Sequence, residues 1–170
     1  MRTGTAAETA VAIALAAVLS LIRIKLPHLA YGGSVSLHAL PILFLALRRG
    51  PRAGMLAGAA YGVVNFVMTP YLVHPVQLVL DYPAAFASLG LAGLAASTGS
   101  GPWTIAAASA GASLARLGSH FLSGVVYFAH LAPEGTPVWK YSLLYNASYM
   151  VPETLIAAAS IPWLVRRVPS

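Results

Sequence analysis

The feature that most constrains this chain is the length of its stretches without charge. Between Asp81 and Arg116 there is no Asp, Glu, Lys or Arg, and charged residues make up only 8% of the 170 residues. Soluble domains carry about 25% charged residues. Hydrophobic residues account for 58% of the sequence, and the mean hydropathy is +0.76. Because this small number of charged residues cannot cover a surface that faces water, we expect most of the chain to lie in lipid.

Proline, glycine and arginine clusters divide the apolar sequence into six segments. A helix needs about 20 residues to cross the hydrocarbon core of a bilayer. The predicted helices cover residues 7–24, 36–48, 52–69, 75–96, 103–129 and 146–165. We therefore predict an all-α integral membrane protein with six transmembrane helices, forming a single domain over residues 1–170. The first apolar run could mimic a signal peptide, but the apolar runs that follow favour an uncleaved helix.

The positions of lysine and arginine predict the orientation, because short cytoplasmic loops are enriched in them. Six helices put one group of arginines on the same side: Arg2, Arg48, Arg49, Arg52, Arg166 and Arg167. We expect that side, and both termini, to be cytoplasmic. Arg23 and Lys25 break the rule, since they lie at the outer end of the first helix.

The predicted outer loops contain more residues that could bind a ligand than the inner loops do. They cover about residues 25–35, 70–75 and 130–145, and they are rich in His, Tyr, Trp and Pro. The formal net charge of +6 does not indicate nucleic acid, because the basic residues cluster at the ends of apolar runs, where lipid head groups meet them. We therefore expect a binding site to face outward.

A few polar residues lie in the outer third of the predicted bundle. Ionisable groups inside a membrane are costly and are usually functional. Asp81, His120 and Asn146 fall at similar depths on three helices. Aromatic residues lie at the same height: Tyr71, Tyr82, Phe128, Tyr141 and Tyr145.

This combination suits a small organic cation that contains an aromatic ring. Aromatic faces attract cations, and a desolvated carboxylate adds a Coulomb attraction. The amide and the imidazole can bind the hydrogen-bonding edge of a flat ring. The alternative is that the tyrosines form an interfacial belt and that Asp81 only snorkels from a helix end.

Two further ionisable residues, Arg116 and Glu153, lie deeper at matching depths. We interpret them as a structural ion pair. Arg116 precedes His120 by four residues, so the two share a helix face. The chain has no cysteine, and no His, Asp or Glu spacing suits a metal, so we predict no metal site.

Small residues repeat along the first helix. Ala12, Ala16 and Ser20 follow an i, i+4, i+8 spacing, and an adjoining stripe contains other alanines: Ala6, Ala10 and Ala14. Such spacing lets another helix backbone approach closely. The stripe indicates either packing within the bundle or a docking face for a partner membrane protein.

Missing motifs narrow the function. There is no phosphate-binding glycine loop and no G-x-S-x-G nucleophile motif. The chain therefore cannot hydrolyse ATP itself, and six helices without a repeat are few for a stand-alone transporter. Three readings stay open at this point: a capture protein for an organic cation, an intramembrane enzyme using Asp81 and His120, and a membrane scaffold.

Several stretches, taken in order, resemble one known family. They are Ala12-x3-Ala16-x3-Ser20 with LSLI, SVSLHALPILFLALRRGPRAG (34–54), the pair Asp81-Tyr82, ARLGSHFLSGVVYF (115–128) and Tyr141-x4-Asn146. The chain resembles the thiamine-specific S components (ThiT type) of energy-coupling factor (ECF) vitamin transporters. The similarity covers nearly the whole chain.

The resemblance implies a multi-pass protein of a prokaryotic plasma membrane that captures thiamine from outside, with no cofactor and no catalysis. It implies that Asp81 faces the thiazolium ring. It also implies that the pyrimidine end is contacted by His120, Tyr141 and Asn146, and that aromatic residues complete the pocket: Tyr31, Tyr71, Tyr82 and Phe128. The alanine stripe with Ala12, Ala16 and Ser20 would meet a transmembrane coupling subunit, which two ATPase subunits drive.

The chain departs from the family pattern at three positions. The family usually has glutamate where Asp81 stands and tryptophan at the positions of Tyr31 and Phe128. Smaller rings lose contact area and cation–π strength, so we expect weaker thiamine binding or a related precursor as the ligand. Other vitamins such as riboflavin or biotin carry no fixed positive charge, which would leave Asp81 without a role.

Overall fold

The structure, a computed structural model, describes residues 3–29 and 32–168. Tyr31 and Arg2 lie outside these residues. The elements follow in the order α1 (Thr3–Leu21), β1 (Arg23–Ile24), β2 (Val35–Ser36), α2 (Ala39–Arg49), α3 (Pro51–Met68), α4 (Pro75–Val79), η1 (Leu80–Ala84), α5 (Ala85–Ala87), η2 (Ser88–Leu91), α6 (Ala92–Ala95), α7 (Pro102–Tyr127), η3 (Ala129–Leu131) and α8 (Val138–Arg167). The elements from α4 to α6 follow one another without a break and form one irregular helix. The described chain therefore has six long helical segments, which confirms the predicted all-α architecture.

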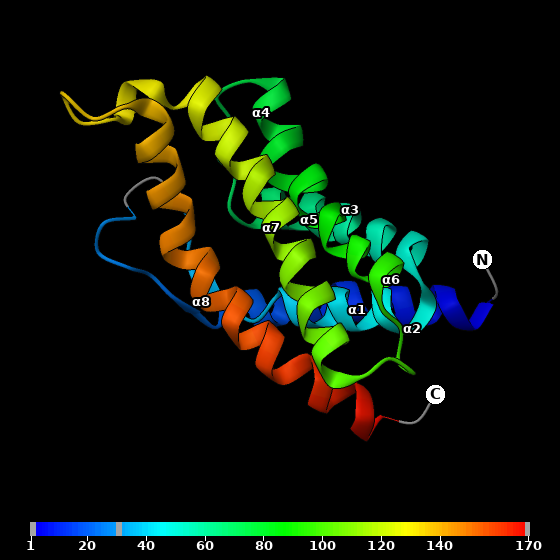
Figure 1. The fold of residues 1–170 in the computed structure, drawn as a ribbon. Helices are drawn as coiled ribbons and strands as arrows, with labels where there is room; N and C mark the ends of the chain where they lie inside the picture. The colour runs from blue at the N-terminus through cyan, green and yellow to red at the C-terminus, as the bar shows by residue number, and fades with distance from the viewer. Residues whose placement is uncertain (1–2, 30–31, 169–170) are drawn as a thin grey trace.

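The helices form a bundle with distinct ends (Figure 1). The long helices α7 and α8 pack together as an antiparallel pair, and α1, α2 and α3 pack against one another. Both termini lie toward one end of the molecule, whereas residues 70–74 and the connection between α7 and α8 lie at the other. This arrangement separates the two sets of loops that the sequence assigned to opposite sides of the membrane.

Two helix boundaries differ from the predicted ones because of a small hairpin. Arg23 and Ile24 pair antiparallel with Ser36 and Val35, so α1 ends at Leu21 rather than at residue 24. The same pairing moves the start of the second helix from residue 36 to Ala39. Strands of two residues leave no alternating pattern in a sequence, so only the folded chain reveals them.

The last helix starts two turns earlier than predicted. It begins at Val138, directly after Pro137, rather than at residue 146. The first turns contain Trp139, Lys140 and Tyr141, whose aromatic and polar character resembles a loop in sequence. The extension places Tyr141 and Tyr145 on a helix face instead of in a loop.

The irregular helix from Pro75 to Ala95 contains a wide π-helical turn, η1, with Pro83 inside it. Proline has no N–H to donate and collides with the carbonyl group four residues earlier in a regular helix. π-Helical turns of this kind occur frequently at functional sites. Asp81 belongs to this turn.

Glycines bring α3 into backbone contact with the irregular helix. Gly54, Gly58 and Gly62 recur every four residues along α3, a spacing typical of close helix packing in membranes. A Cβ atom at Gly58 would collide with the backbone of Phe86, and one at Gly62 would collide with the carbonyl group of Tyr82. This contact holds the turn with Asp81 against the rest of the bundle.

The outside of the bundle is apolar. Large hydrophobic side chains such as Val67, Leu94 and Trp103 are exposed, whereas the core contains fully buried Ile42 and Leu43. Within the described residues, two helical stretches, Gly4–Leu21 and Pro75–Ala95, are long and apolar enough by themselves to cross a membrane. The other long helices carry more polar residues or are shorter.

We predict that Gly58→Ala destabilises the fold, because its methyl group has no space against the backbone of Phe86 and Ala87. The expected loss is about 1–3 kcal/mol, measured as a lower thermal unfolding midpoint of the purified protein in detergent. Gly111→Ala is the matched control, since open space surrounds that position on α7. The unfolding midpoint of the Gly111 variant should stay unchanged or rise. Equal losses of stability in both variants would contradict the packing argument.

Candidate functional site

A cavity of about 310 Å³ opens among α3, the irregular helix, α7, α8 and the hairpin. All predicted ligand-binding residues within the described chain line it: Tyr71, Asp81, Tyr82, His120, Phe128, Tyr141 and Asn146. Tyr31 lies outside the described residues. Arg23 and Lys25, which broke the charge rule in sequence, also line this cavity and are exposed.

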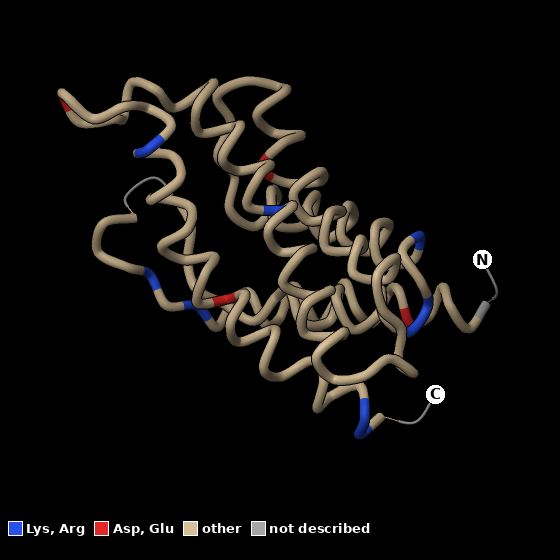
Figure 2. Tube along the Cα trace, in the orientation of Figure 1, with Lys and Arg blue, Asp and Glu red and all other residues tan. Residues whose placement is uncertain are grey.

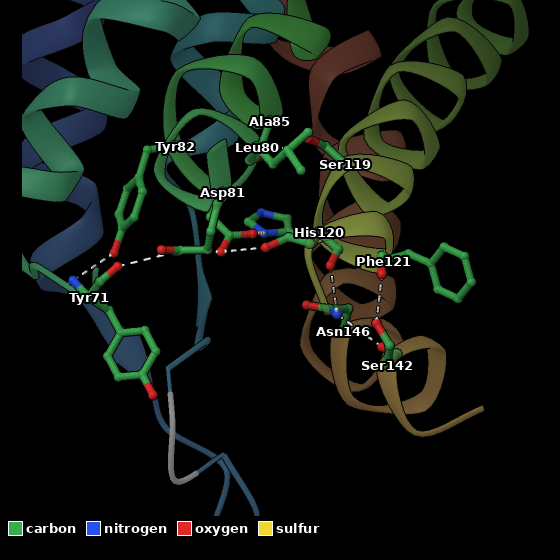
Figure 3. A network of polar contacts seen from close by, with 12 residues as sticks. Tyr71, Leu80, Asp81, Tyr82, Ala85, Ser119, His120, Phe121, Ser142 and Asn146 are labelled. Carbon is green, nitrogen blue, oxygen red and sulfur yellow. Dashed lines mark hydrogen bonds and ion pairs between the residues drawn. The ribbon is translucent and has the colours of Figure 1, made fainter. Parts of the chain in front are cut away.

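Asp81 holds the centre of a polar network (Figure 3). Its Oδ2 atom accepts hydrogen bonds from Gln77 Nε2 at 2.7 Å and from Ser123 Oγ at 2.9 Å. Its Oδ1 atom lies 3.1 Å from His120 Nδ1. The side chains of Asp81 and His120 are only 17% and 12% exposed. Among the described residues, no Lys or Arg lies within ion-pair distance of Asp81, so hydrogen bonds orient the carboxylate and no permanent cation neutralises it.

Gln77 orients the carboxylate and was missed in the sequence. Besides Asp81, its amide donates to the Tyr71 carbonyl group at 3.2 Å and accepts from Val73 N at 3.0 Å. It is 1% exposed. Gln77 precedes Asp81 by four residues, which places both side chains on one helix face. This spacing is the sequence feature from which Gln77 could have been predicted. Gln77 thereby ties the loop before α4 to the carboxylate.

Aromatic rings wall the cavity near Asp81. Tyr71 and Phe128 stack with their ring centroids 5.8 Å apart. The Tyr82 hydroxyl group donates to the Thr69 carbonyl group at 3.0 Å and accepts from Tyr71 N at 3.1 Å. Tyr82 therefore positions the loop that carries Tyr71, in addition to lining the cavity.

The α8 side of the cavity is an amide and tyrosine network. Asn146 Nδ2 donates to the Ser142 carbonyl group at 2.9 Å and contacts the His120 carbonyl group at 3.4 Å. Its Oδ1 atom accepts from the Tyr149 hydroxyl group at 2.9 Å. At Gly124 a Cβ atom would collide with Ser142, so α7 and α8 approach closely there. Tyr149, which lies two turns of helix from Tyr141, also lines the cavity but was not among the predicted site residues.

Arg116 and Glu153 form an ion pair deeper in the bundle. Arg116 Nη1 donates to Glu153 Oε2 at 2.8 Å, and their side chains are 5% and 3% exposed. Glu153 Oε1 also accepts from the backbone N–H of Ser36 at 2.8 Å. The pair thus anchors strand β2 of the hairpin to α7 and α8.

The alanine stripe needs a correction. Ala12 and Ala16 are 6% and 0% exposed and belong to the core of this chain, and Ser20 lines the cavity. Their small side chains serve packing within the bundle, so these two alanines do not offer a surface to a partner. The alanines of the adjoining stripe, Ala6, Ala10 and Ala14, are exposed, as are Gly4 and Ala7.

Comparison with known proteins identifies similar chains. Residues 6–170 match the family model described as "Thiamine transporter protein". The chain is 38% identical to the thiamine transporter ThiT of Bacillus subtilis, over 95% of this chain and 90% of that protein. It is 32% identical to the thiamine transporter ThiT of Lacticaseibacillus paracasei, over 95% and 87%. The solved structure of ThiT from Listeria monocytogenes matches with a TM-score of 0.80 and 26% identity, covering 99% of this chain and 96% of that chain.

We predict that Glu153→Ala destabilises the protein strongly, because it leaves Arg116 buried without a charge partner and frees the Ser36 N–H. Breaking a buried ion pair costs about 3–5 kcal/mol, which thermal unfolding in detergent measures. Glu8→Ala is the control, since Glu8 pairs with Arg49 at the exposed end of the bundle. A midpoint as low in the Glu8 variant as in the Glu153 variant would refute the anchoring role.

Proposed function

This chain belongs to the thiamine transporter protein family, and from that premise we propose that it is the substrate-binding S component of an ECF-type uptake transporter. Family membership establishes a six-helix membrane protein of a prokaryote whose function is transport rather than catalysis. We propose that it captures thiamine from the outside, in the cavity between the helices. Asp81 is the proposed counter-charge of the thiazolium ring.

The observation that carries this proposal is the environment of Asp81. The carboxylate is largely buried at membrane depth, yet among the described residues only Gln77, Ser123 and His120 bind it. A buried carboxylate is costly unless a positive charge compensates it. A permanently cationic ring in the cavity supplies that charge, whereas a neutral ligand would not.

The other end of the ligand has suitable partners on α7 and α8. His120 Nδ1 is held by Asp81, and its Nε2 atom is buried without a partner among the described residues. His120 Nε2 and the nearby Asn146 and Tyr141 support binding of an aminopyrimidine ring, which carries several donors and acceptors at its edge. The stacked rings of Tyr71 and Phe128 support binding of a flat, cationic molecule.

The hairpin supports a route for ligand entry. Its base is fixed by the buried bond from Ser36 N to Glu153, whereas its outer contacts are exposed: Tyr145 Oη to the Gly32 carbonyl group at 2.8 Å and His28 to Ser148 at 2.8 Å. Gly32 and its neighbour Gly33 have positive φ angles of 118° and 84°. We propose that the exposed contacts break first and that the hairpin opens about its anchored base.

The charge distribution supports an orientation with both termini in the cytoplasm. Arg48 and Arg49 end α2, and Arg166 and Arg167 end α8. Figure 2 shows blue Lys and Arg segments close to both ends of the chain. Positive residues favour the cytoplasmic side. The cavity residues around Asp81 then face outward.

Release into the cell would require the ECF transmembrane coupling subunit and its two ATPase subunits, because this chain has no nucleotide-binding motif. The exposed alanines Ala6, Ala10 and Ala14 of α1 are the proposed contact with the coupling subunit. Small residues at this spacing allow close approach of a second membrane helix.

We predict that Asp81→Asn weakens thiamine binding to the purified protein by at least about tenfold, measured by calorimetry without ATP. The variant keeps the shape of the side chain but removes the charge that faces the thiazolium ring. Binding of an analogue with an uncharged ring in place of the thiazolium should change much less. Glu8→Gln serves as the control, since Glu8 lies in an exposed ion pair outside the cavity. An equal loss for both ligands would rule out the counter-charge role.

We predict that Ala10→Leu weakens assembly with the coupling subunit and leaves thiamine affinity unchanged, because the larger side chain keeps the two helices apart. Co-purification with the coupling module and calorimetry of the isolated chain measure the two effects. Ala115→Leu, on the exposed face of α7, is the matched control and should assemble normally. Normal assembly of the Ala10 variant would exclude this stripe as the contact.

A further inference from the structure

The irregular helix begins at a histidine that lies outside the cavity. His74 is the N-cap of α4, and Pro75 follows at the first helical position. The backbone of His74 is extended, with φ −153° and ψ 146°, and its carbonyl group accepts from Leu78 N at 3.0 Å. Its ring nitrogen Nδ1 accepts a hydrogen bond from Val76 N at 3.1 Å. His74 thus satisfies one of the N–H groups that the first turn of a helix leaves without a partner.

Histidine is an uncommon residue for this position. Ser, Thr, Asp and Asn are the preferred N-cap residues. Their oxygen atoms accept hydrogen bonds at any pH near neutral, whereas an imidazole nitrogen accepts only when it carries no hydrogen. The bond from Val76 therefore requires a neutral His74 ring with its hydrogen on Nε2. Protonation removes the acceptor and adds a positive charge beside the free N–H groups of the helix, where the helix dipole opposes it.

Few groups surround the imidazole of His74. The ring of Tyr127, on α7, stacks on it with centroids 5.0 Å apart and an angle of 18° between the planes. Among the described residues, no Asp or Glu lies within ion-pair distance of His74, and the only charged residue of the irregular helix, Asp81, lies seven positions further on. Tyr127 is thus the titratable group in contact with the imidazole. Because an aromatic face also attracts a cation, protonation changes the hydrogen bond to Val76 rather than the stacking.

The capped turn belongs to a segment with little packing of its own. Residues 70–76 are all exposed, so few buried contacts hold them. Hydrogen bonds do so instead: Val73 N donates to Gln77 Oε1 at 3.0 Å, and Gln77 Nε2 donates to the Tyr71 carbonyl group at 3.2 Å. Tyr71 N donates to the Tyr82 hydroxyl group at 3.1 Å (Figure 3). Segments held by exposed backbone hydrogen bonds open locally at low cost, so one cap contributes substantially to their order.

This segment connects His74 to the ligand site. His74 Nδ1 fixes Val76 in the first turn, and the next residue is Gln77, which binds both the Tyr71 carbonyl group and the Asp81 carboxylate. Tyr71 and Asp81 line the cavity, whereas His74 does not. Loss of the cap therefore loosens the residues that carry Tyr71 without removing a group that touches the ligand.

We propose that His74 is a positioning residue for thiamine binding: its neutral imidazole caps the irregular helix and holds residues 70–73, with Tyr71, at the cavity. The effect on affinity rests on the proposed function, whereas the cap itself does not. Because the cap requires Nδ1 without a hydrogen, its contribution is present at neutral pH. It is lost as the pH falls through the range in which histidine titrates.

The test measures thiamine affinity by calorimetry on the full chain in detergent, at about pH 7.5 and about pH 5.5, on either side of the range of histidine titration. At the higher pH, His74→Ala should bind about threefold to tenfold more weakly than the wild type, as expected for a lost cap. His74→Asn should stay within about twofold of the wild type, because an asparagine oxygen caps the same N–H and does not titrate.

The lower pH separates the cap from other titrating groups. There the wild-type protein should bind thiamine about threefold more weakly than His74→Asn, because only the wild type loses its cap. The titrations of His120 and of the ligand are common to both proteins and cancel in this ratio. His130→Asn is the matched control, since His130 is exposed in η3 and makes no hydrogen bond or ring contact with the described residues. It should keep the affinity and the pH profile of the wild type.

Hydrogen–deuterium exchange of the segment from Thr69 to Leu80 provides a readout that needs no ligand. At the higher pH, this segment should exchange faster in His74→Ala than in the wild-type protein, because the Val76 N–H has lost its acceptor. His74→Asn should restore the protection. Unchanged exchange in a folded His74→Ala protein would disprove the cap.

The outcomes separate this inference from the proposed function. If the wild-type protein binds no thiamine, the proposed function fails, and the exchange measurement alone decides whether His74 orders the segment. If thiamine binds but His74→Ala binds it as tightly as the wild type, the positioning role is refuted. The same conclusion follows if the ratio between the wild-type and His74→Asn affinities is equal at both pH values, or if His130→Asn changes the pH profile as much as His74→Asn does.

Discussion

The structure depends on how a carboxylate is compensated inside a membrane. Two carboxylates, those of Glu153 and Asp81, lie inside the bundle, and they have different partners. Glu153 is paired with Arg116 and also binds the Ser36 N–H, so its charge is neutralised within the protein. Asp81 is oriented by Gln77, Ser123 and His120 but receives no permanent positive charge from the described residues. Desolvated charges need a partner: Glu153 has one within the fold, and the proposed partner of Asp81 is the cationic ligand.

The rest of the bundle positions these two groups. Gly58 and Gly62 let α3 touch the irregular helix directly, which holds the wide turn containing Asp81 and Pro83 against the core. Close packing of α7 and α8 at Gly124 brings His120 and Asn146 to the same cavity. The residues that bring these groups together are therefore mostly small ones, at which two helix backbones approach closely.

Sequence reasoning found the residues that are rare in lipid and missed those defined by contacts. Asp81 and His120 stood out because ionisable groups are scarce in apolar helices, and the structure brings both to one cavity. Gln77 and Tyr61 did not stand out, because a glutamine or a tyrosine near a membrane surface is ordinary until its partners are known. The alanines of α1 were found by their spacing, which predicted a close helix contact for Ala12 and Ala16. Spacing alone could not tell whether the neighbouring helix belongs to a partner or to the same bundle, and the structure buries both alanines within this chain.

The sequence by itself determined the membrane class, the six helices, the resemblance to thiamine S components and Asp81 as a candidate site residue, which the structure places in the cavity. These follow from composition, from periodic punctuation and from local motifs, which do not require knowledge of distant contacts. Only the tertiary structure decided that Gln77 binds Asp81, that residues 23–24 pair with 35–36, and that His38, Tyr61 and Arg116 surround the ring of Phe86. The physical reason is that pairing, hydrogen-bond satisfaction and cavity shape depend on atoms far apart in the chain, whose distances no local pattern contains.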